Sequence, residues 1–320
     1  MNCLCCGKQL KEENEFMWHK SCIKHFFDTP YFPDIEISED VLQYIITNNI
    51  NKGLTIPGVQ KKLSLHLSFE NHKSRLTLVD YPTGYILKPQ VNEFKCLPEA
   101  EHLVMSMADK TGNSTVPHAL IKKDGIFAYI TKRIDRVYDK KQIKKIAMED
   151  FCQLDMRLTA DKYKGSYERC AKLIKKFSGQ PGFDLSEIFI RLVFSFVVGN
   201  SDMHLKNFSL IENNGKYVLS KAYDLLPVNI ILPEDKEEFA LTLNGKKTNI
   251  RKKDFVIFAK ECGISEIAAR KMIQKIVSLK PVYIDMVNES YIPQDEKQSF
   301  INLINDRCKL KGIISNALSR

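Results

Sequence analysis

The fold of this chain is decided by the stretch Gly199-Asn200-Ser201-Asp202-Met203-His204-Leu205-Lys206-Asn207. An apolar run at 184–198 precedes this stretch, and its composition and length predict a buried helix. Gly199 and Asn200 tolerate the left-handed backbone that commonly ends a helix, so both are expected to adopt it. The sequence therefore predicts a polar loop that is presented by the end of a buried helix.

A predicted hairpin follows this loop and leads to a second acidic residue. The turn residues Asn213-Asn214-Gly215 join two short strand-like segments, 208–211 and 216–219. The chain then reaches Ala222-Tyr223-Asp224-Leu225. Asp224 thus stands just beyond the hairpin, where it could join the polar loop in one site.

The residue types in the loop favour phosphoryl transfer from a nucleotide. Asp202 and Asn207 have the D-x-x-x-x-N spacing of a catalytic base and a metal ligand in kinase catalytic loops. The Asn207 amide oxygen and the Asp224 carboxylate suit Mg²⁺, which prefers oxygen ligands. Lys206 could neutralise charge that develops on the transferred group.

An N-terminal lysine fits the same chemistry. Lys88 ends the apolar strand-like segment Tyr85-Ile86-Leu87, and a lysine in this position is typical of phosphate binding in kinases. Glu101 on the next predicted helix could hold Lys88 in place. Glu99 is the competing partner, and helical phase does not decide between them.

A glycine-containing segment at 53–62 could fold over the phosphates. Glycine lets backbone N–H groups approach closely, and lysines add positive charge. Gly58, Gln60 and Lys62 are the candidate nucleotide-binding residues here. The segment matches neither G-x-x-x-x-G-K-[ST] nor G-x-G-x-x-G, and an ordinary turn is the alternative interpretation.

The composition fits a globular protein with an anionic partner. The 320 residues are 44% hydrophobic and 27% charged, and the formal net charge is +9. This length allows about two domains. The apolar runs are too short for a membrane span, and the beginning of the chain lacks the apolar region of a signal peptide. We therefore expect a cytoplasmic protein. The positive charge is spread over short clusters, so no direct nucleic-acid binding is predicted.

The first 30 residues contain a candidate structural zinc site. Cys3, Cys6, His19 and Cys22 form two close pairs separated by about a dozen residues, a spacing that suits tetrahedral zinc. Cys5 and His25 are alternatives for one ligand position. The competing interpretation is a group of free thiols near the terminus.

Periodicity predicts an α+β protein with two lobes. The expected domains are a zinc-binding unit at 1–30, a strand-rich N-lobe at 31–136 and a helical C-lobe at 137–320, with the lobe boundary near 134–140. Strands are expected at 62–67, 84–88 and 126–131. Helices are expected over these ranges: 38–50, 98–109, 146–158, 166–178, 184–198, 251–261, 264–278 and 296–310.

The motifs together resemble the HipA family of bacterial toxin kinases, and especially its short HipT-type members. The similarity covers roughly residues 50–315. It rests on the following segments: Gly58-Val59-Gln60-Lys61-Lys62-Leu63-Ser64, Tyr85-Ile86-Leu87-Lys88-Pro89, Lys132-Arg133-Ile134-Asp135-Arg136, Glu149-Asp150-Phe151-Cys152-Gln153, Gly199 to Ser209 and Ala222-Tyr223-Asp224-Leu225.

The resemblance implies a bilobal kinase-like fold and a serine/threonine kinase that uses ATP and Mg²⁺. It assigns Asp202 as the catalytic base, Asn207 and Asp224 as metal ligands, and Lys88 as the phosphate-binding lysine. It also implies that the segment from Thr131 to Asp135, with Lys132, lies along the nucleotide.

The resemblance further implies substrates, partners and a modification. Family toxins phosphorylate aminoacyl-tRNA synthetases and are restrained by antitoxins, which often include a helix-turn-helix DNA-binding protein. Autophosphorylation occurs in the glycine-containing loop, where this chain has Thr55 in place of serine, with Pro57 close behind. Full-length members carry an additional N-terminal subdomain, which a separate small protein is expected to supply here.

Two other classes of function use the same features. A catalytically silent kinase-like scaffold would bind partners or nucleic acid through the N-terminal unit and the basic clusters. A small-molecule kinase would share the nucleotide site and differ only in its acceptor.

Overall fold

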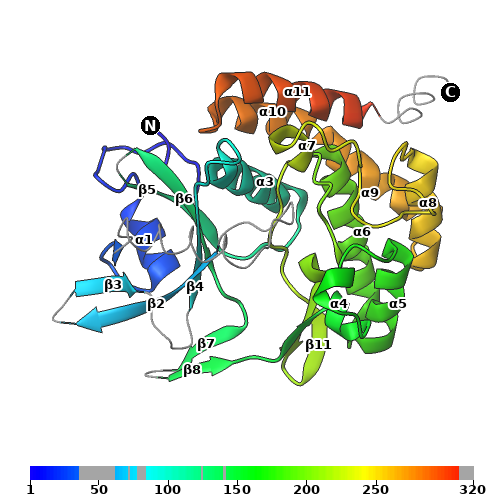
Figure 1. Cartoon of the computed structure of the whole chain (residues 1–320), viewed down its shortest axis with the longest axis horizontal. Coiled ribbons are helices and arrows are strands. Elements are labelled where there is room, and N and C mark those ends of the chain that lie inside the picture. The colour runs from blue at the N-terminus through cyan, green and yellow to red at the C-terminus, as the bar shows by residue number, and fades with distance from the viewer. Residues whose placement is uncertain (36–61, 71–72, 78–83, 124, 140–141, 310–320) are drawn as a thin grey trace. The chain divides into compact units, whose positions relative to one another are not determined.

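The computed structural model describes residues 1–35, 62–70, 73–77, 84–123, 125–139 and 142–309. The chain divides into two compact units (Figure 1). The first comprises Met1–His102 and Val116–Lys145, and the second comprises Leu103–Thr115 and Ile146–Arg320. The expected helix at 38–50 and most of the glycine-containing segment, including Thr55, Gly58 and Gln60, lie outside the described residues.

A six-stranded sheet forms the centre of the first unit, in the order β1-β3-β2-β4-β6-β5. Its strands are β1 (Asp34–Ile35), β2 (Leu63–Glu70), β3 (Lys73–Thr77), β4 (Tyr85–Pro89), β5 (His118–Lys123) and β6 (Ile126–Lys132). The pairing of β1 with β3 is parallel, and the other pairs are antiparallel. A separate hairpin joins β7 (Arg136–Asp139) to β8 (Gln142–Lys145).

Alternation along the strands assigns each side chain to one face of this sheet. Leu63 and Leu65 in β2 are buried and pair with Leu87 and Tyr85 of β4, so all four lie on one face. Lys88 points to the opposite face, because successive residues of a strand alternate. The predicted period of two in 62–67 is therefore confirmed.

Helix α1 (Lys20–Phe27) contacts the sheet through aromatic side chains. The rings of Phe26 and Phe27 lie 5.9 and 5.7 Å from the ring of Tyr85. The Tyr85 hydroxyl donates a hydrogen bond to the Phe26 carbonyl at 3.2 Å. Because Tyr85 and Lys88 point to opposite faces of β4, α1 covers the face away from Lys88.

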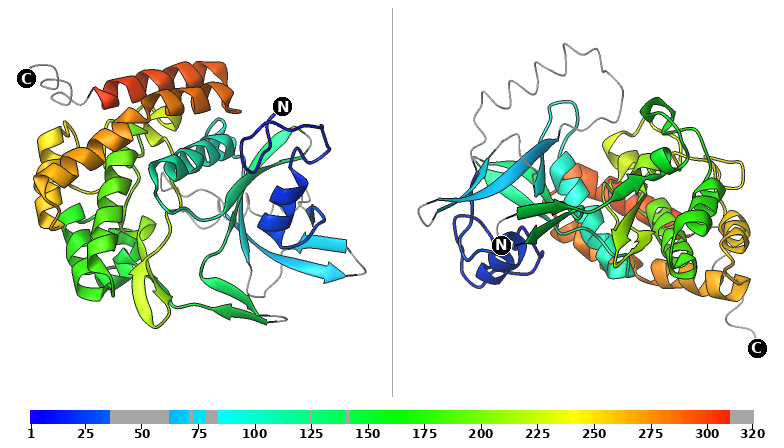
Figure 2. Two further views of the ribbon diagram at one scale, coloured as in Figure 1. Left: turned by 180° about the vertical axis from the view of Figure 1, so that it is seen from behind. Right: turned by 90° about the horizontal axis from the view of Figure 1, so that it is seen from below.

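Helices form most of the second unit, and α6 is central to them. Its helices are α4 (Phe151–Leu154), α5 (Tyr167–Phe177), α6 (Pro181–Val197), α7 (Val228–Ile231), α8 (Lys252–Glu261), α9 (Glu266–Ser278), α10 (Lys280–Glu289) and α11 (Gln294–Cys308). α6 contacts α5, α8, α9 and α11, and α10 packs beside α11 (Figure 2). α3 (Leu97–Thr111) begins in the first unit and ends in the second.

A three-stranded antiparallel sheet completes the second unit, in the order β11-β10-β9. Its strands are β9 (Met148–Asp150), β10 (Ser209–Asn213) and β11 (Lys216–Leu219). Asn214 and Gly215 have φ angles of 51° and 77°. Two positive φ angles are what a two-residue type I′ turn requires, so the predicted hairpin is confirmed.

The predicted helix at 146–158 is wrong. Its first part is β9, which pairs with β10, and a helix begins only at Phe151. Asp150 caps that short helix, because its carboxylate accepts from the Gln153 amide at 2.9 Å while Gln153 Oε1 accepts from the Asp150 amide at 3.0 Å. The helix α10, which directly follows α9, was not predicted. Among the described residues, no helix combines the length and hydrophobicity needed to cross a membrane.

Candidate active site

The polar loop at 199–207 begins where α6 ends. α6 carries fully buried side chains such as Leu192 and Val193, so the position of its last turn is fixed by packing. Gly199 has a φ of 70°, as expected, and a Cβ atom there would lie 3.1 Å from the side chain of Leu303. Asn200 was expected to share this conformation but is not left-handed.

Three tyrosine hydroxyl groups hold the loop in place. Tyr167 donates to the Met203 carbonyl at 3.0 Å, and Tyr223 donates to the Lys206 carbonyl at 3.0 Å. Tyr163 donates to Asp202 Oδ1 at 2.8 Å. We call these residues the loop tyrosines. The loop tyrosines fix two backbone carbonyls and one side chain of the loop. Their hydroxyl groups are neutral, so they preorganise the loop without adding charge to it.

Tyr223 also connects the loop to the segment that carries Asp224. Its single hydroxyl proton goes to the Lys206 carbonyl, because a carbonyl oxygen can only accept. The hydroxyl of Ser209, 2.6 Å from the Tyr223 oxygen, must then donate to it. Asp224 follows Tyr223 directly, so this network links the two segments that carry the predicted metal ligands.

The environment of Asp202 raises its pKa to about 6. Burial is the largest cause, because it disfavours the charged carboxylate, and the negative charge of Asp224 adds to the effect. The hydrogen bond from Tyr163 acts in the opposite direction. The charge of Asp224 therefore acts on Asp202, and their joint role in one site stays a prediction.

Asn207 is held against the Asp202 backbone of the same loop. Its side-chain nitrogen donates to the Asp202 carbonyl at 2.8 Å. The amide oxygen is therefore the group that remains for a cation. Asp224 has a φ of 61°, a left-handed conformation that aspartate tolerates better than most residues. A divalent cation would relieve the repulsion between the two carboxylates, so this donor set fits Mg²⁺.

Lys206 forms an ion pair with Asp150, with 2.5 Å between Nζ and Oδ2. Asp150 is the residue that caps α4, so one side chain both ends β9 and orients the loop lysine. A phosphate group that contacted Lys206 would share this ammonium with Asp150.

Lys88 is held in the first unit by Glu101 rather than Glu99. The Lys88 ammonium lies 2.5 Å from Glu101 Oε1, and the two side chains are 4% and 0% exposed. It also lies 5.3 Å from the centre of the Tyr129 ring. Burial raises the pKa of Glu99, which does not pair with the lysine. The lysine therefore has one defined orientation on the face of the sheet opposite α1.

The other predicted nucleotide-binding residues of the first unit are engaged differently. Lys62 is exposed immediately before β2. Lys132 forms an ion pair with Asp28, which follows α1. Asp135 accepts hydrogen bonds from Arg133 at 2.8 and 2.9 Å and from Arg136 at 2.5 Å. Burial would raise the pKa of Asp135, but the two arginines outweigh it and keep that pKa below its ordinary value.

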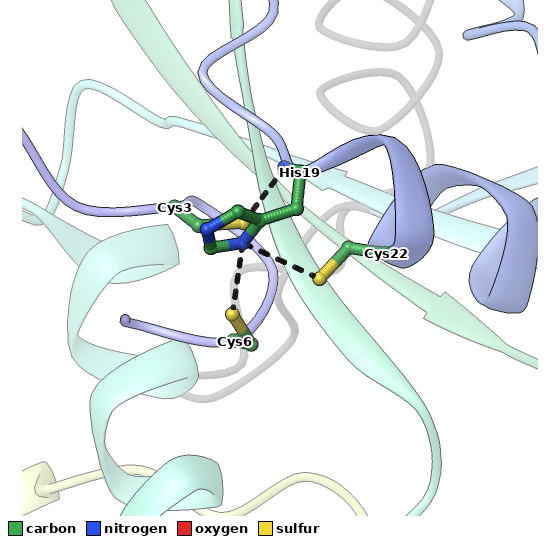
Figure 3. A group of neighbouring side chains, drawn as sticks. All are labelled: Cys3, Cys6, His19 and Cys22. Carbon is green, nitrogen blue, oxygen red and sulfur yellow. Dashed lines mark hydrogen bonds between the residues drawn. The ribbon is translucent and has the colours of Figure 1, made fainter. Parts of the chain in front are cut away.

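The predicted zinc ligands lie together in the first unit (Figure 3). The candidate ligand atoms of Cys3, Cys6, His19 and Cys22 are all within 4.8 Å of one another. Of the alternatives, neither Cys5 nor His25 belongs to this group. All nine cysteines lie in the described part of the chain, and all are thiols.

Sequence reasoning missed the loop tyrosines and the role of Asp150. Tyr163 and Tyr167 are 39 and 36 residues from their partners, and nothing in a local pattern identifies such contacts. Asp150 belongs to Glu149-Asp150-Phe151-Cys152-Gln153, one of the segments on which the resemblance rests. Its acidic side chain was the only feature that could have indicated an ion pair with Lys206.

The family model for the HipA-like C-terminal domain matches residues 54–281. The chain belongs to the HipA-like family. The matched range includes Lys88, Glu101, the loop and Asp224, so it covers the candidate residues described above apart from the zinc ligands, Asp28 and Leu303. The HipT-type subdivision stays a prediction.

Three relatives carry kinase names. A Haemophilus influenzae protein named "Putative kinase" is 28% identical, and the alignment covers 96% of each chain. Two Sinorhizobium fredii proteins, "Putative kinase Y4mE" and "Putative kinase Y4dM", are 28% and 30% identical. The alignments cover 80% and 66% of this chain but only 63% and 54% of those proteins. The chain therefore spans less than two thirds of the two longer relatives.

Two solved structures share the fold. HipA from Shewanella oneidensis, in a complex of a toxin–antitoxin system with HipB and operator DNA, aligns with a TM-score of 0.68 at 18% identity. The alignment covers 94% of this chain and 73% of that one. CtkA, a proinflammatory kinase from Helicobacter pylori, aligns with a TM-score of 0.53 at 14% identity over 77% of this chain and 90% of that chain. The predicted α+β kinase-like fold is confirmed.

Proposed function

We propose that this HipA-like protein is an ATP- and Mg²⁺-dependent serine/threonine protein kinase. The observation that carries the proposal is that Asp202 and Asn207 lie in one preorganised loop, which a hydrogen bond from Tyr223 connects to the segment carrying Asp224. The buried pair of Lys88 and Glu101 in the first unit supports it. Kinases use the same residue types to accept a hydroxyl proton, hold the metal and neutralise phosphate.

The chain's own groups would divide the chemistry as follows. Asp202 accepts a hydrogen bond from the attacking hydroxyl and takes its proton as the new oxygen–phosphorus bond forms, while the bond from the γ-phosphorus to the bridging oxygen breaks and ADP leaves. Its raised pKa suits this role, because a base near neutrality combines deprotonation with proton affinity. Lys206 offsets charge on the transferred group, shared with Asp150. Bound Mg²⁺ supplies charge neutralisation of the phosphates, and Asn207 and Asp224 would hold it.

Membership of the HipA-like family supports a proposal for the biological role. We propose that the kinase is the toxin of a HipA/HipT-type toxin–antitoxin module that acts in the cytoplasm. Its substrate would be a translation-related protein such as an aminoacyl-tRNA synthetase, and Thr55 is the candidate for autophosphorylation. An antitoxin would restrain it. The HipA complex with HipB and operator DNA supports such partners.

The deciding experiment compares wild-type protein with Asp202→Asn after brief expression, by phosphoproteomics and by consumption of the ATP γ-phosphate with Mg²⁺. Loss of a catalytic base typically costs about 10²–10⁴-fold in rate, while nucleotide binding should persist. Asp161→Asn, an equivalent change in a carboxylate that pairs with Lys164, is the matched control.

The outcomes separate the alternatives. Equal activity of wild type and Asp202→Asn would remove Asp202 from the mechanism. ATP consumption without new phosphoproteins would favour a small-molecule kinase. Absence of any consumption would favour a silent scaffold. Coexpression with the neighbouring genes should suppress the phosphorylation if an antitoxin is among them.

A further inference from the structure

The group formed by Cys3, Cys6, His19 and Cys22 has the donor geometry of a tetrahedral zinc site. Zinc lies about 2.3 Å from sulfur and about 2.0–2.1 Å from nitrogen, so a tetrahedral site separates the two donors by roughly 3.6 Å. His19 Nδ1 lies 3.4 Å from Cys6 Sγ and 3.8 Å from Cys22 Sγ. These distances bracket the expected value, so little movement would be needed to admit the ion.

The second nitrogen of His19 fixes the orientation that a ligand requires. His19 Nε2 lies 3.2 Å from the backbone carbonyl of Gln9. A carbonyl can only accept, so Nε2 carries the hydrogen. In a neutral ring, Nδ1 then carries the lone pair, and it faces the thiols of Cys6 and Cys22 (Figure 3). Zinc-bound histidines commonly have such a carbonyl partner.

The backbone around Cys3 and Cys6 forms a tight turn. The Gly7 amide donates to the Cys3 carbonyl at 2.9 Å, and the Cys3 amide donates to the Lys8 backbone carbonyl at 2.8 Å. Gly7 has a φ of 70°, which favours glycine. The His19 backbone amide also donates to Cys3 Sγ at 3.4 Å, a contact that would stabilise a thiolate. The turn therefore brings both sulfur atoms to the same side.

Residues next to the ligands cover the edge of the six-stranded sheet. β5 is the last strand of that sheet, so within the described part of the chain one of its edges has no neighbouring strand. The Leu120 amide on this edge donates to the Leu4 carbonyl at 2.9 Å, and Trp18 Nε1 donates to the Leu120 carbonyl at 3.0 Å. Leu4 follows Cys3, and Trp18 precedes His19. A metal that joins these two ligands would therefore join the two groups that cover the edge.

We propose that Cys3, Cys6, His19 and Cys22 bind one structural Zn²⁺ that fastens the N-terminal segment to the edge of β5. Three thiolates and one imidazole are a soft donor set that favours zinc, and four protein ligands leave no position for a substrate. Each thiol loses its proton on binding, so the site carries a net charge of −1. The proposal is independent of the nucleotide chemistry of the second unit.

The first test is the metal content of the full-length wild-type protein, purified without chelators. We expect about one zinc per chain, released when the thiols are blocked with a mercurial reagent. Cobalt(II) in its place should give the d–d absorption of a tetrahedral ion and thiolate-to-metal charge transfer. Absence of zinc, or a cobalt spectrum without charge transfer from sulfur, would overturn the proposed site.

Two cysteine variants form a matched pair. Cys6→Ser removes a proposed ligand, and we expect it to lose the zinc. Cys5→Ser changes the neighbouring cysteine, which is outside the ligand group, and should keep it. Retention of zinc in Cys6→Ser, or its loss in Cys5→Ser, would overturn this choice of ligands.

Hydrogen exchange on the wild-type protein tests the fastening of β5. Removal of zinc should accelerate exchange of the Leu120 amide towards that of an unprotected amide. Peptides from β10 and β11, in the other unit, should be unaffected. If zinc binds but its removal does not change exchange at Leu120, the metal site stands and its proposed role in fastening β5 is overturned. The measurement uses wild-type protein only, so it does not depend on the folding of a variant.

Discussion

The two units hold their candidate catalytic residues in different ways. In the second unit, Asp202 is oriented by a neutral tyrosine hydroxyl, so its position is fixed while its charge is not neutralised by that partner. In the first unit, Lys88 is positioned by the opposite charge of Glu101 in a buried pair. The neutral Tyr163 leaves the charge of Asp202 available for a cation or a substrate proton. In the ion pair, the charge of Glu101 holds the Lys88 side chain in position.

The largest expected effect tests the ion pair. Glu101→Gln removes the carboxylate that pairs with the buried Lys88 ammonium, and removal of one member of a buried ion pair typically costs about 3–5 kcal/mol in the free energy of unfolding. The double variant Lys88→Met/Glu101→Gln should recover much of this loss, because no buried charge remains. Trp18 is the only tryptophan in the chain and is buried in the first unit, so its fluorescence during denaturation reports on this unit.

The corresponding control is Lys88→Met alone, which leaves the Glu101 carboxylate buried and should also destabilise the unit. Equal stability of Glu101→Gln and the double variant would contradict the expected cost of leaving the Lys88 charge buried without the Glu101 carboxylate.

An intermediate effect is expected at Asp224. Asp224→Asn keeps a residue that tolerates a φ of 61° but removes the charge. We expect Mg²⁺-dependent nucleotide affinity to fall by at least the roughly 10–100-fold that loss of an outer-shell partner costs. Titration calorimetry with and without Mg²⁺ measures this change.

Asp224→Ala should bind nucleotide as weakly as Asp224→Asn and lose stability as well, because alanine in the left-handed region costs roughly 1–2 kcal/mol. Asp285→Ala, which changes an exposed aspartate on α10, is the control. Unchanged Mg²⁺-dependent affinity in Asp224→Asn would contradict the assignment of a metal ligand.

The smallest effect is expected for Tyr163→Phe. Its hydroxyl lowers the pKa of Asp202, so its removal should raise that pKa. A base with a higher pKa is protonated at higher pH, and the acid limb of the kcat/KM profile should move upward by roughly one pH unit.

Tyr167→Phe provides the comparison, because its hydroxyl contacts a backbone carbonyl rather than the carboxylate. It should lower stability by about 1 kcal/mol without moving the acid limb. Identical profiles for the two variants would mean that Tyr163 only supports the loop.

The features that sequence could predict are those fixed by local patterns. The alternation in β2, the Asn214-Gly215 turn and the helix before Gly199 all follow from residues near one another in the chain. The spacing of Cys3, Cys6, His19 and Cys22 is equally local and anticipated their proximity in the structure.

The features that sequence missed depend on distant partners. The segment 148–150 has no strong strand signal of its own and becomes β9 only because β10 pairs with it. Glu99 and Glu101 lie two positions apart on one helix, and only the rotation of α3 relative to β4 distinguishes them. The contacts of the loop tyrosines join residues far apart in sequence, so no window of local sequence contains them.

The hydroxyl of Tyr223 has a mechanical consequence. This hydroxyl donates to the Lys206 carbonyl and accepts from Ser209, so Tyr223, which precedes Asp224, is hydrogen-bonded to the loop that carries Asn207. The protein therefore restricts the distance between the two predicted metal ligands, Asn207 and Asp224, before any ion binds. We therefore expect the proposed Mg²⁺ site to discriminate between cations by radius, and Ca²⁺ to bind there less well than the smaller Mg²⁺.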